Sequence, residues 1–242
     1  MTRHVPSEKV RLLIKRLIDG SIMNPRYKEE PGAPTRQKLV AAAIRSFGQK
    51  GYDGASIREI AQAAHVNIAG IAYHFGGKEQ LYRACLQHIT ETIRSGLGEA
   101  EPAASPQSMT PAQARRALKD RLLAMAEFIL ATPNAASFVR MVVREQMDPS
   151  PAFSILYAEF MEPVHRRLCA LWSRITGDEA EGEATKLAVF SLLGQILVFR
   201  IARAGALKRM GWSDIGAREL RVLKERIEIN VDLLTRRHGD RR

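Results

Sequence analysis

Residues 56–82 have the sequence SIREIAQAAHVNIAGIAYHFGGKEQLY. Ser56 followed three residues later by Glu59 is the capping-box pattern that begins a helix, and apolar residues recur behind it at helical spacing. A tight corner at His65 separates this helix from a second one, which Asn67 can cap and which two glycines end. The second helix should therefore present its outer side to solvent, in the geometry that enters a DNA major groove.

Helical patterns continue on both sides of this stretch. A helix beginning at Thr35 precedes it, and a further helix beginning at Lys78 follows it. Long helical patterns also fill the part of the chain beyond a region rich in proline and glycine, and no alternating pattern typical of a strand is present. We predict an all-α fold, in which a three-helix helix-turn-helix domain at residues 35–95 is followed by a helical bundle at residues 112–238.

The charge of the chain points to a polyanionic partner. The 242 residues include 37 Lys and Arg against 26 Asp and Glu, which gives a formal net charge of +11. Hydrophobic residues make up 45% of the chain, a share typical of a folded globular protein. A basic surface that serves only solubility is the alternative, but together with a helix-turn-helix pattern the charge favours nucleic acid.

Several other functional classes lack their sequence patterns. The 2 cysteines, Cys85 and Cys169, have no second Cys or His at metal-ligand spacing, so we expect reduced thiols and no metal. No P-loop, G-x-S-x-G, H-E-x-x-H or glycine-rich dinucleotide pattern occurs, so we expect neither an enzyme nor a cofactor. We find no apolar run of about 18 residues, which argues against a membrane span and for a cytoplasmic protein. An interaction module that does not bind DNA is the remaining alternative.

The N-terminal extension, residues 1–34, carries a short basic amphipathic helix from Ser7 to Asp19. We favour the interpretation that it covers an apolar patch of its own domain. A DNA-contacting arm, a helix that docks on a partner subunit and a helix on a membrane surface are the alternatives.

From Thr35 onward, the run TRQKLVAAAIRSFGQKGYDGASIREIAQAAHVNIAGIAYHFGGKEQLY resembles the DNA-binding domain of the TetR/AcrR family of bacterial regulators. Further along, FVRMVVREQMDPSPAF and the last two long helices are similar to the C-terminal domains of the CerR/CecR-type subgroup. The resemblance implies a dimeric transcriptional regulator that binds double-stranded DNA and is by default a repressor.

The resemblance also implies roles for individual residues. Those expected at the DNA backbone are Thr35, Arg36, Ser56, Arg58, Tyr73, His74 and Lys78. Those expected on the face that contacts the bases are Asn67, Ile68, Ala69, Gly70 and Ala72. For each residue the alternative is an ordinary solvated surface position or a helix cap.

The base-contacting face is unusually small and apolar. Ala69 and Ala72 can touch thymine methyl groups, and Asn67 can hydrogen-bond adenine. Gly70 is consistent with a close approach of the backbone to DNA. His65 stands where relatives usually have glycine, and histidine tolerates a positive φ better than most residues do.

For the C-terminal half, the resemblance implies a homodimer formed through the last two helices, a palindromic operator and an unknown small-molecule effector. Candidate effector contacts are Phe128, Phe138, Met141, Arg144, Phe160, His165 and Trp172. For each of these, core packing is the alternative, because aromatic residues and methionine at helical spacing usually belong to a core.

Overall fold

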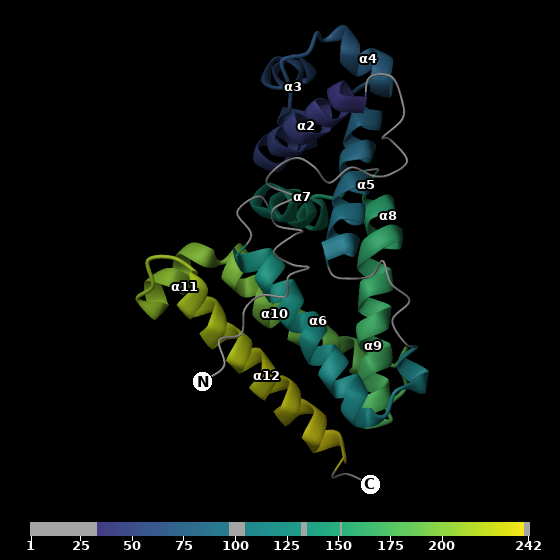
Figure 1. The fold of residues 1–242 in the computed structure, drawn as a ribbon, viewed down its shortest axis with the longest axis vertical. Coiled ribbons are helices and arrows are strands. Elements are labelled where there is room, and N and C mark those ends of the chain that lie inside the picture. The colour runs from purple at the N-terminus through teal and green to yellow at the C-terminus, as the bar shows by residue number, and fades with distance from the viewer. Residues whose placement is uncertain (1–32, 97–104, 132–134, 151, 240–242) are drawn as a thin grey trace. The chain divides into compact units, whose positions relative to one another are not determined.

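The structure is a computed structural model that describes residues 33–96, 105–131, 135–150 and 152–239. These residues form helices and connecting turns without a strand, which confirms the predicted all-α class (Figure 1). The chain divides into two compact units, residues 1–98 with 133–160 and residues 99–132 with 161–242. The extension helix expected at Ser7 to Asp19 lies outside the described residues.

Unit 1 contains the predicted helix-turn-helix together with a segment from later in the chain. Its elements are α2 (Ala33–Gly54), α3 (Ile57–Ala63), α4 (Ala69–Phe75), α5 (Lys78–Gly96), α7 (Ala135–Met147), α8 (Phe153–Leu156) and most of the π-helical turn η3 (Tyr157–Met161). Side chains from α2, α3, α4 and α5 form one small core. Its fully buried members are Leu39, Ile44, Phe47, Ile60, Ile71, Leu81, Leu86 and Ile89.

Helix α7 packs along α2 at places where only glycine fits. A β-carbon at Gly48 would lie 2.9 Å from the backbone oxygen of Ser137, so the two helices approach more closely than a side chain would allow. A β-carbon at Gly51 would lie 2.6 Å from Nε of Arg144, and Gly51 also has a φ of 77°, which favours glycine. The segment 133–160 therefore packs in unit 1, beside the helices of the predicted helix-turn-helix.

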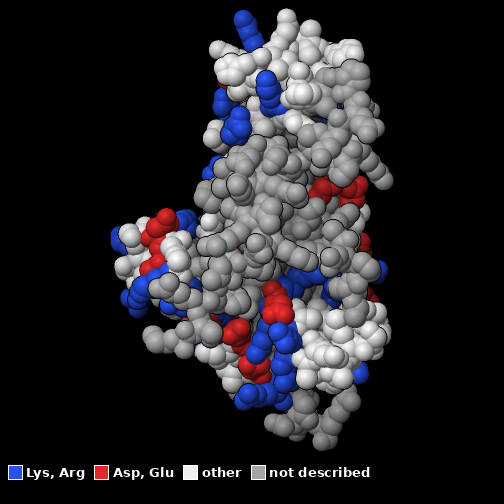
Figure 2. All heavy atoms as spheres, viewed as in Figure 1, with Lys and Arg blue, Asp and Glu red and all other residues white. Residues whose placement is uncertain are grey.

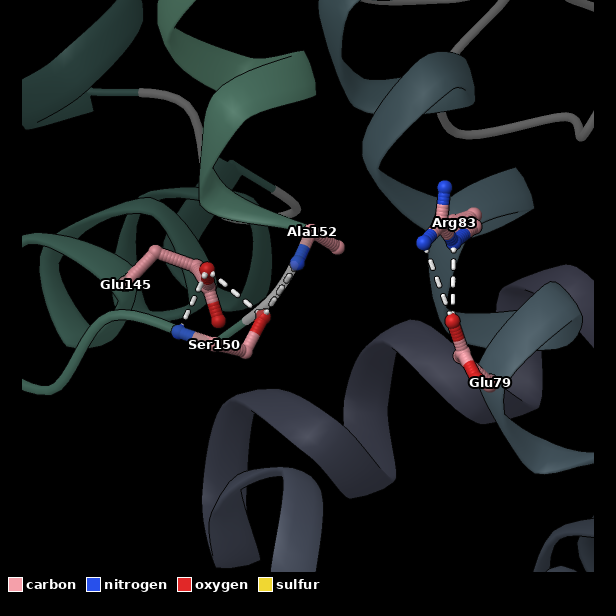
Figure 3. Close-up of polar contacts among 5 residues, drawn as sticks. All are labelled: Glu79, Arg83, Glu145, Ser150 and Ala152. Atoms are coloured by element: carbon pink, nitrogen blue, oxygen red, sulfur yellow. Dashed lines mark hydrogen bonds and ion pairs between the residues drawn. The ribbon is translucent and has the colours of Figure 1, made fainter.

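A buried carboxylate also joins α7 to α5. Glu145 on α7 is only 2% exposed, and it accepts hydrogen bonds from the hydroxyl of Tyr82 on α5 and, at 3.0 Å, from the hydroxyl of Ser150. Figure 3 shows Glu145 and Ser150 facing each other, with the Ser150 hydroxyl also accepting from the backbone N–H of Ala152. Burial and the bond to Glu145 both raise the pKa of Tyr82 far above its ordinary value, so this hydroxyl stays protonated and acts as a donor.

Unit 2 is a helical bundle around one central helix. Its elements are η2 (Pro106–Ser108), α6 (Pro111–Ala131), α9 (Glu162–Thr176), α10 (Glu183–Ile201), α11 (Arg203–Met210) and α12 (Ala217–Gly239). Helix α6 packs against α9, α10 and α12. Two ion pairs join α6 to α12: the Nζ of Lys119 lies 2.7 Å from Asp232, and the Nζ of Lys224 lies 2.6 Å from Glu127.

Two features of the C-terminal half differ from the expectation. Helix α11 is a separate short element between the two long final helices, which the sequence pattern did not distinguish. By length and composition alone, helix α10 is long and apolar enough to span a membrane, although the sequence analysis found no apolar run of this length. Of its apolar stretch, 22% is buried inside the protein.

We predict that Tyr82→Phe lowers the free energy of unfolding by about 1 to 3 kcal/mol, because it leaves a buried oxygen of Glu145 without its donor. Urea denaturation followed by circular dichroism measures the change. Tyr52→Phe is the matched control, since Tyr52 contributes ring contacts to the same cluster and should lose little. Equal losses in the two variants would contradict a stabilising role for the buried bond.

Candidate nucleic-acid interface

The corner between α3 and α4 sets the direction of α4. His65 has a φ of 55°, in the left-handed region, and its backbone N–H bonds to the carbonyl of Gln62 at 3.0 Å. The next residue, Val66, donates its N–H to the carbonyl of Ala61 at the same distance. The positive φ expected at His65 is thus confirmed, and it reverses the chain within three residues of the end of α3.

The inner side of α4 holds the helix against the rest of unit 1. Ile71 is 1% exposed and Phe75 is 8% exposed, and both pack in the core with Ile60 of α3. Gly76 ends the helix in the left-handed conformation with a φ of 77°. Because two buried residues four positions apart fix the rotation of the helix, the positions on its opposite side face outward.

The outer side of α4 contains most of the residues expected to contact bases. Exposed positions on and just before the helix are Asn67, Ile68, Ala69, Ala72 and Tyr73. The side chain of Ile68 is 45% exposed and that of Tyr73 is 83% exposed, which are high values for large apolar groups. His74 is half-buried, with its ring 5.0 Å from the ring of Tyr73.

Gly70 differs from its neighbours in direction. A β-carbon at this position would lie 2.8 Å from Cγ1 of Val66, inside the protein's own corner. Internal packing therefore accounts for the glycine without any approach of the backbone to a ligand.

The helix start also departs from the predicted capping pattern. Ser56 is the N-cap residue of α3, but its side chain makes no capping hydrogen bond, and Glu59 instead pairs with the Nζ of Lys50 at 2.6 Å. The capping box predicted for these two residues is therefore wrong. At α4 the N-cap residue is Ile68 rather than the predicted Asn67, although Oδ1 of Asn67, one residue earlier, accepts the backbone N–H of Ala69 at 2.9 Å.

Two of the three cationic residues expected at the DNA backbone lie against aromatic rings. The guanidinium of Arg36 lies 5.0 Å from the centre of the Phe75 ring, and the Nζ of Lys78 lies 4.9 Å from the centre of the Tyr52 ring. The ammonium of Lys78 also donates to the carbonyl of Asp53 at 3.2 Å, which leaves further N–H groups for another acceptor. Arg58 is exposed on α3, whereas Thr35 is half-buried in the first turn of α2 rather than preceding it.

The surface around these helices carries little negative charge in one view. Figure 2 shows blue Lys and Arg side chains around white atoms at the end of unit 1 where Figure 1 has α2, α3 and α4, with very little red. On unit 2, by contrast, red and blue side chains alternate where α6 and α12 lie, in agreement with their ion pairs. An outward helix beside positive charge is suited to bind a nucleic-acid backbone.

The candidate effector residues are split between the two units. Three of them, Phe138, Met141 and Arg144, lie on α7 in unit 1. Phe138 is buried, with its ring 6.2 Å from that of His88, and Met141 is 1% exposed. Arg144 is exposed and donates a hydrogen bond to the carbonyl of Gln49 at 3.5 Å. Phe160, in η3, is half-buried at the end of unit 1.

The other three candidates belong to unit 2. Phe128 on α6 and Trp172 on α9 are buried, and the ring of His165 lies 4.2 Å from the ring of Phe190. Nδ1 of His165 is 3.5 Å from the sulfur of Cys169. Burial lowers the pKa of His165 below its ordinary value, so the neutral ring is favoured.

Comparison with known proteins gives matches over both halves of the chain. Residues 39–85 match the family model described as bacterial regulatory proteins, tetR family, and residues 114–236 match the C-terminal domain of the HTH-type transcriptional dual regulator CecR. The chain is 30% identical over 206 residues to the CecR regulator of Shigella flexneri, which covers 84% of this chain and 92% of that protein.

Other relatives match in part or by fold. The transcriptional repressor NicS of Pseudomonas putida is 38% identical over 55 residues, 23% of this chain and 26% of that protein. A transcriptional regulator from Rhodococcus superposes with a TM-score of 0.58 at 19% identity, covering 83% of this chain and 96% of that one. The regulator AibR, solved with isovaleryl coenzyme A and operator DNA, superposes with a TM-score of 0.57 at 18% identity over the same shares.

We predict that His65→Gly is neutral or stabilises unit 1 by up to about 1 kcal/mol, because glycine adopts a φ of 55° without strain. His65→Val should destabilise it by about 1 to 3 kcal/mol, because a β-branched side chain is disfavoured there. Urea denaturation of the two variants checks the order. A valine variant as stable as the glycine variant would show that the corner does not require this conformation.

Proposed function

The chain belongs to the TetR family of bacterial regulatory proteins, with a C-terminal domain of the CecR type, and from this membership we propose that it is a homodimeric repressor. In this proposal a small-molecule effector releases the repressor from a palindromic operator. The chain is thereby a DNA-binding transcriptional regulator. The observation that carries the proposal is the outward side of α4, held in place by Ile71 and Phe75. We assign it no catalytic role, and its place of action is the cytoplasm.

In the proposed complex, α4 lies in the major groove and the surrounding polar groups contact phosphates. The backbone contacts we propose are Thr35, Arg36, Ser56, Arg58, Tyr73, His74 and Lys78. The rings that hold Arg36 and Lys78 support this assignment, because they restrict two long side chains before DNA binds and so reduce the entropy lost on binding. The base-contacting residues we propose are Asn67, Ile68, Ala69 and Ala72, with Gly70 at the base of the corner.

The proposed dimer covers an apolar strip on the last two long helices. Exposed large apolar side chains follow helical spacing along α10 and α12: Leu187, Phe190, Val198 and Ile201 on the first and Val222, Ile229 and Leu233 on the second. Monomeric proteins rarely expose contiguous apolar surface of this kind. A second copy of the chain, related by a two-fold axis, would bury both strips and match a palindromic operator.

The effector is proposed to bind in unit 2. Of the seven candidates, Phe128, His165 and Trp172 lie in its helices, and the imidazole of His165 is a polar group that could orient an effector among apolar neighbours. The solved complex of AibR with isovaleryl coenzyme A and operator DNA supports a small-molecule effector for this fold. Phe138, Met141 and Arg144 also help to pack α7 onto the DNA-binding helices.

Release is proposed to follow a shift in population. An effector that binds one arrangement of the dimer more tightly than the other favours that arrangement, and operator affinity falls if its recognition helices no longer match successive major grooves. Repression is supported by relatives named as repressors, such as NicS, while the CecR regulator is named a dual regulator.

We predict that the double variant Arg58→Ala, Tyr73→Ala weakens binding to duplexes selected by the wild-type protein by at least tenfold, because it removes a charge and an exposed phenol from the proposed backbone contacts. Fluorescence anisotropy at several salt concentrations should also give a shallower salt dependence. Arg209→Ala removes an equal charge from the exposed side of α11 and should change neither. Unchanged affinity in the double variant would count against α4 as the DNA-contacting element.

We predict that Phe190→Glu converts the dimer to a monomer, because it places a charge in the middle of the apolar strip on α10. Sedimentation equilibrium measures the mass, and operator affinity should fall with it. Met147→Glu is the matched control, because Met147 is 79% exposed at the end of α7 outside the strip. A Phe190 variant that stays dimeric would exclude this interface.

A further inference from the structure

The outer side of α4 has no charged side chain. The exposed positions between Asn67 and Tyr73 hold one amide, one phenol and the apolar side chains of Ile68, Ala69 and Ala72. A positively charged guanidinium or ammonium is the usual partner of guanine in the major groove, and none is present on this face. The chemistry by which this helix can distinguish bases is therefore restricted.

The amide on this face is further restricted by its own hydrogen bond. Asparagine distinguishes adenine through a pair of bonds, in which Oδ1 accepts from the adenine amino group and Nδ2 donates to N7. The Oδ1 of Asn67 already accepts the backbone N–H of Ala69, the first residue of α4, at 2.9 Å. This bond uses one of the two lone pairs of Oδ1, so a two-bond contact with adenine requires that oxygen to accept two hydrogen bonds at once.

The apolar residues form one continuous strip. Ile68 and Ala72 are four residues apart and Ala69 and Ala72 are three apart, so their side chains lie on the same side of the helix. Ile68 is 45% exposed, which is costly for a β-branched aliphatic side chain unless something covers it. Gly70 adds nothing to the strip, because a side chain at that position would meet Val66.

Only one apolar group lies on the base edges of the major groove, and it is the C5-methyl group of thymine. We propose that this protein selects its operator chiefly through thymine methyl groups packed against Ile68, Ala69 and Ala72. The proposal rests on the proposed placement of α4 in the major groove and adds the chemical feature that it recognises there.

The experiment replaces thymine by uracil, which keeps base pairing and removes only the methyl group. Duplexes are first selected from a random pool by the wild-type protein, and the enriched duplex is then synthesised with thymine or with uracil at each half-site position. Each methyl group that packs against the strip should contribute about fourfold to the affinity, and several losses should multiply. The dissociation constants come from fluorescence anisotropy.

A variant separates direct contact from a change in DNA shape. In Ala72→Ser the strip becomes polar at one position, so the ratio of thymine to uracil affinity should fall toward one at the thymine that Ala72 contacts. Ala41→Ser makes the same change at an exposed position on α2 and should leave every ratio as in the wild type. If the ratios are the same in both variants, the methyl groups act through DNA deformability and the proposal is wrong.

Two further results overturn it in distinguishable ways. A protein that selects a sequence but binds its uracil form equally well keeps its function as a DNA-binding regulator and loses only methyl recognition. A protein that enriches no duplex from the pool loses both. A uracil penalty that disappears with Ala72→Ser supports the proposal.

Discussion

Burial of Ile71 and Phe75 is the interaction on which the rest of the DNA-binding unit depends. Helix α4 has seven residues, fewer than an isolated helix needs to be stable in water, so its conformation comes from packing rather than from its own propensity. The same two side chains also fix its rotation and thereby decide which residues are available to a partner. Stability and recognition are thus set by opposite sides of one short helix.

The packing of α7 extends this support to the far side of α2. Gly48 and Gly51 allow the two helices to approach, and the buried Glu145 is acceptable there because Tyr82 and Ser150 satisfy its oxygens. A carboxyl group that is nearly excluded from water tolerates little displacement, since each lost bond leaves a buried oxygen without a donor. Helix α7 is therefore tied to the DNA-binding helices by polar geometry as well as by apolar contact.

The sequence predicted the helices well because their apolar spacing and glycine ends are local signals. It also anticipated the positive φ at His65, which the shortness of the corner requires. The capping box at Ser56 failed because Lys50, nine residues before Glu59, captures that carboxylate, and such competition depends on the folded arrangement. The place of residues 133–160 in unit 1 and the donor for Glu145 could not be predicted, because they rest on contacts between residues more than sixty positions apart.

Affinity and selectivity are assigned to different residues in this interface. In the proposed complex, cations such as Arg58 and Lys78 contact phosphates of any sequence, and this attraction weakens with salt. The outer side of α4 is uncharged, so the contacts that distinguish one base pair from another add little to the attraction for DNA of any sequence. A regulator of this kind must gain its preference for one DNA sequence from close packing of α4 against the base edges. That packing is lost when α4 moves by a small distance. The same property that leaves the helix without charged contacts therefore makes operator binding by the proposed dimer sensitive to small changes in the spacing of its two α4 helices.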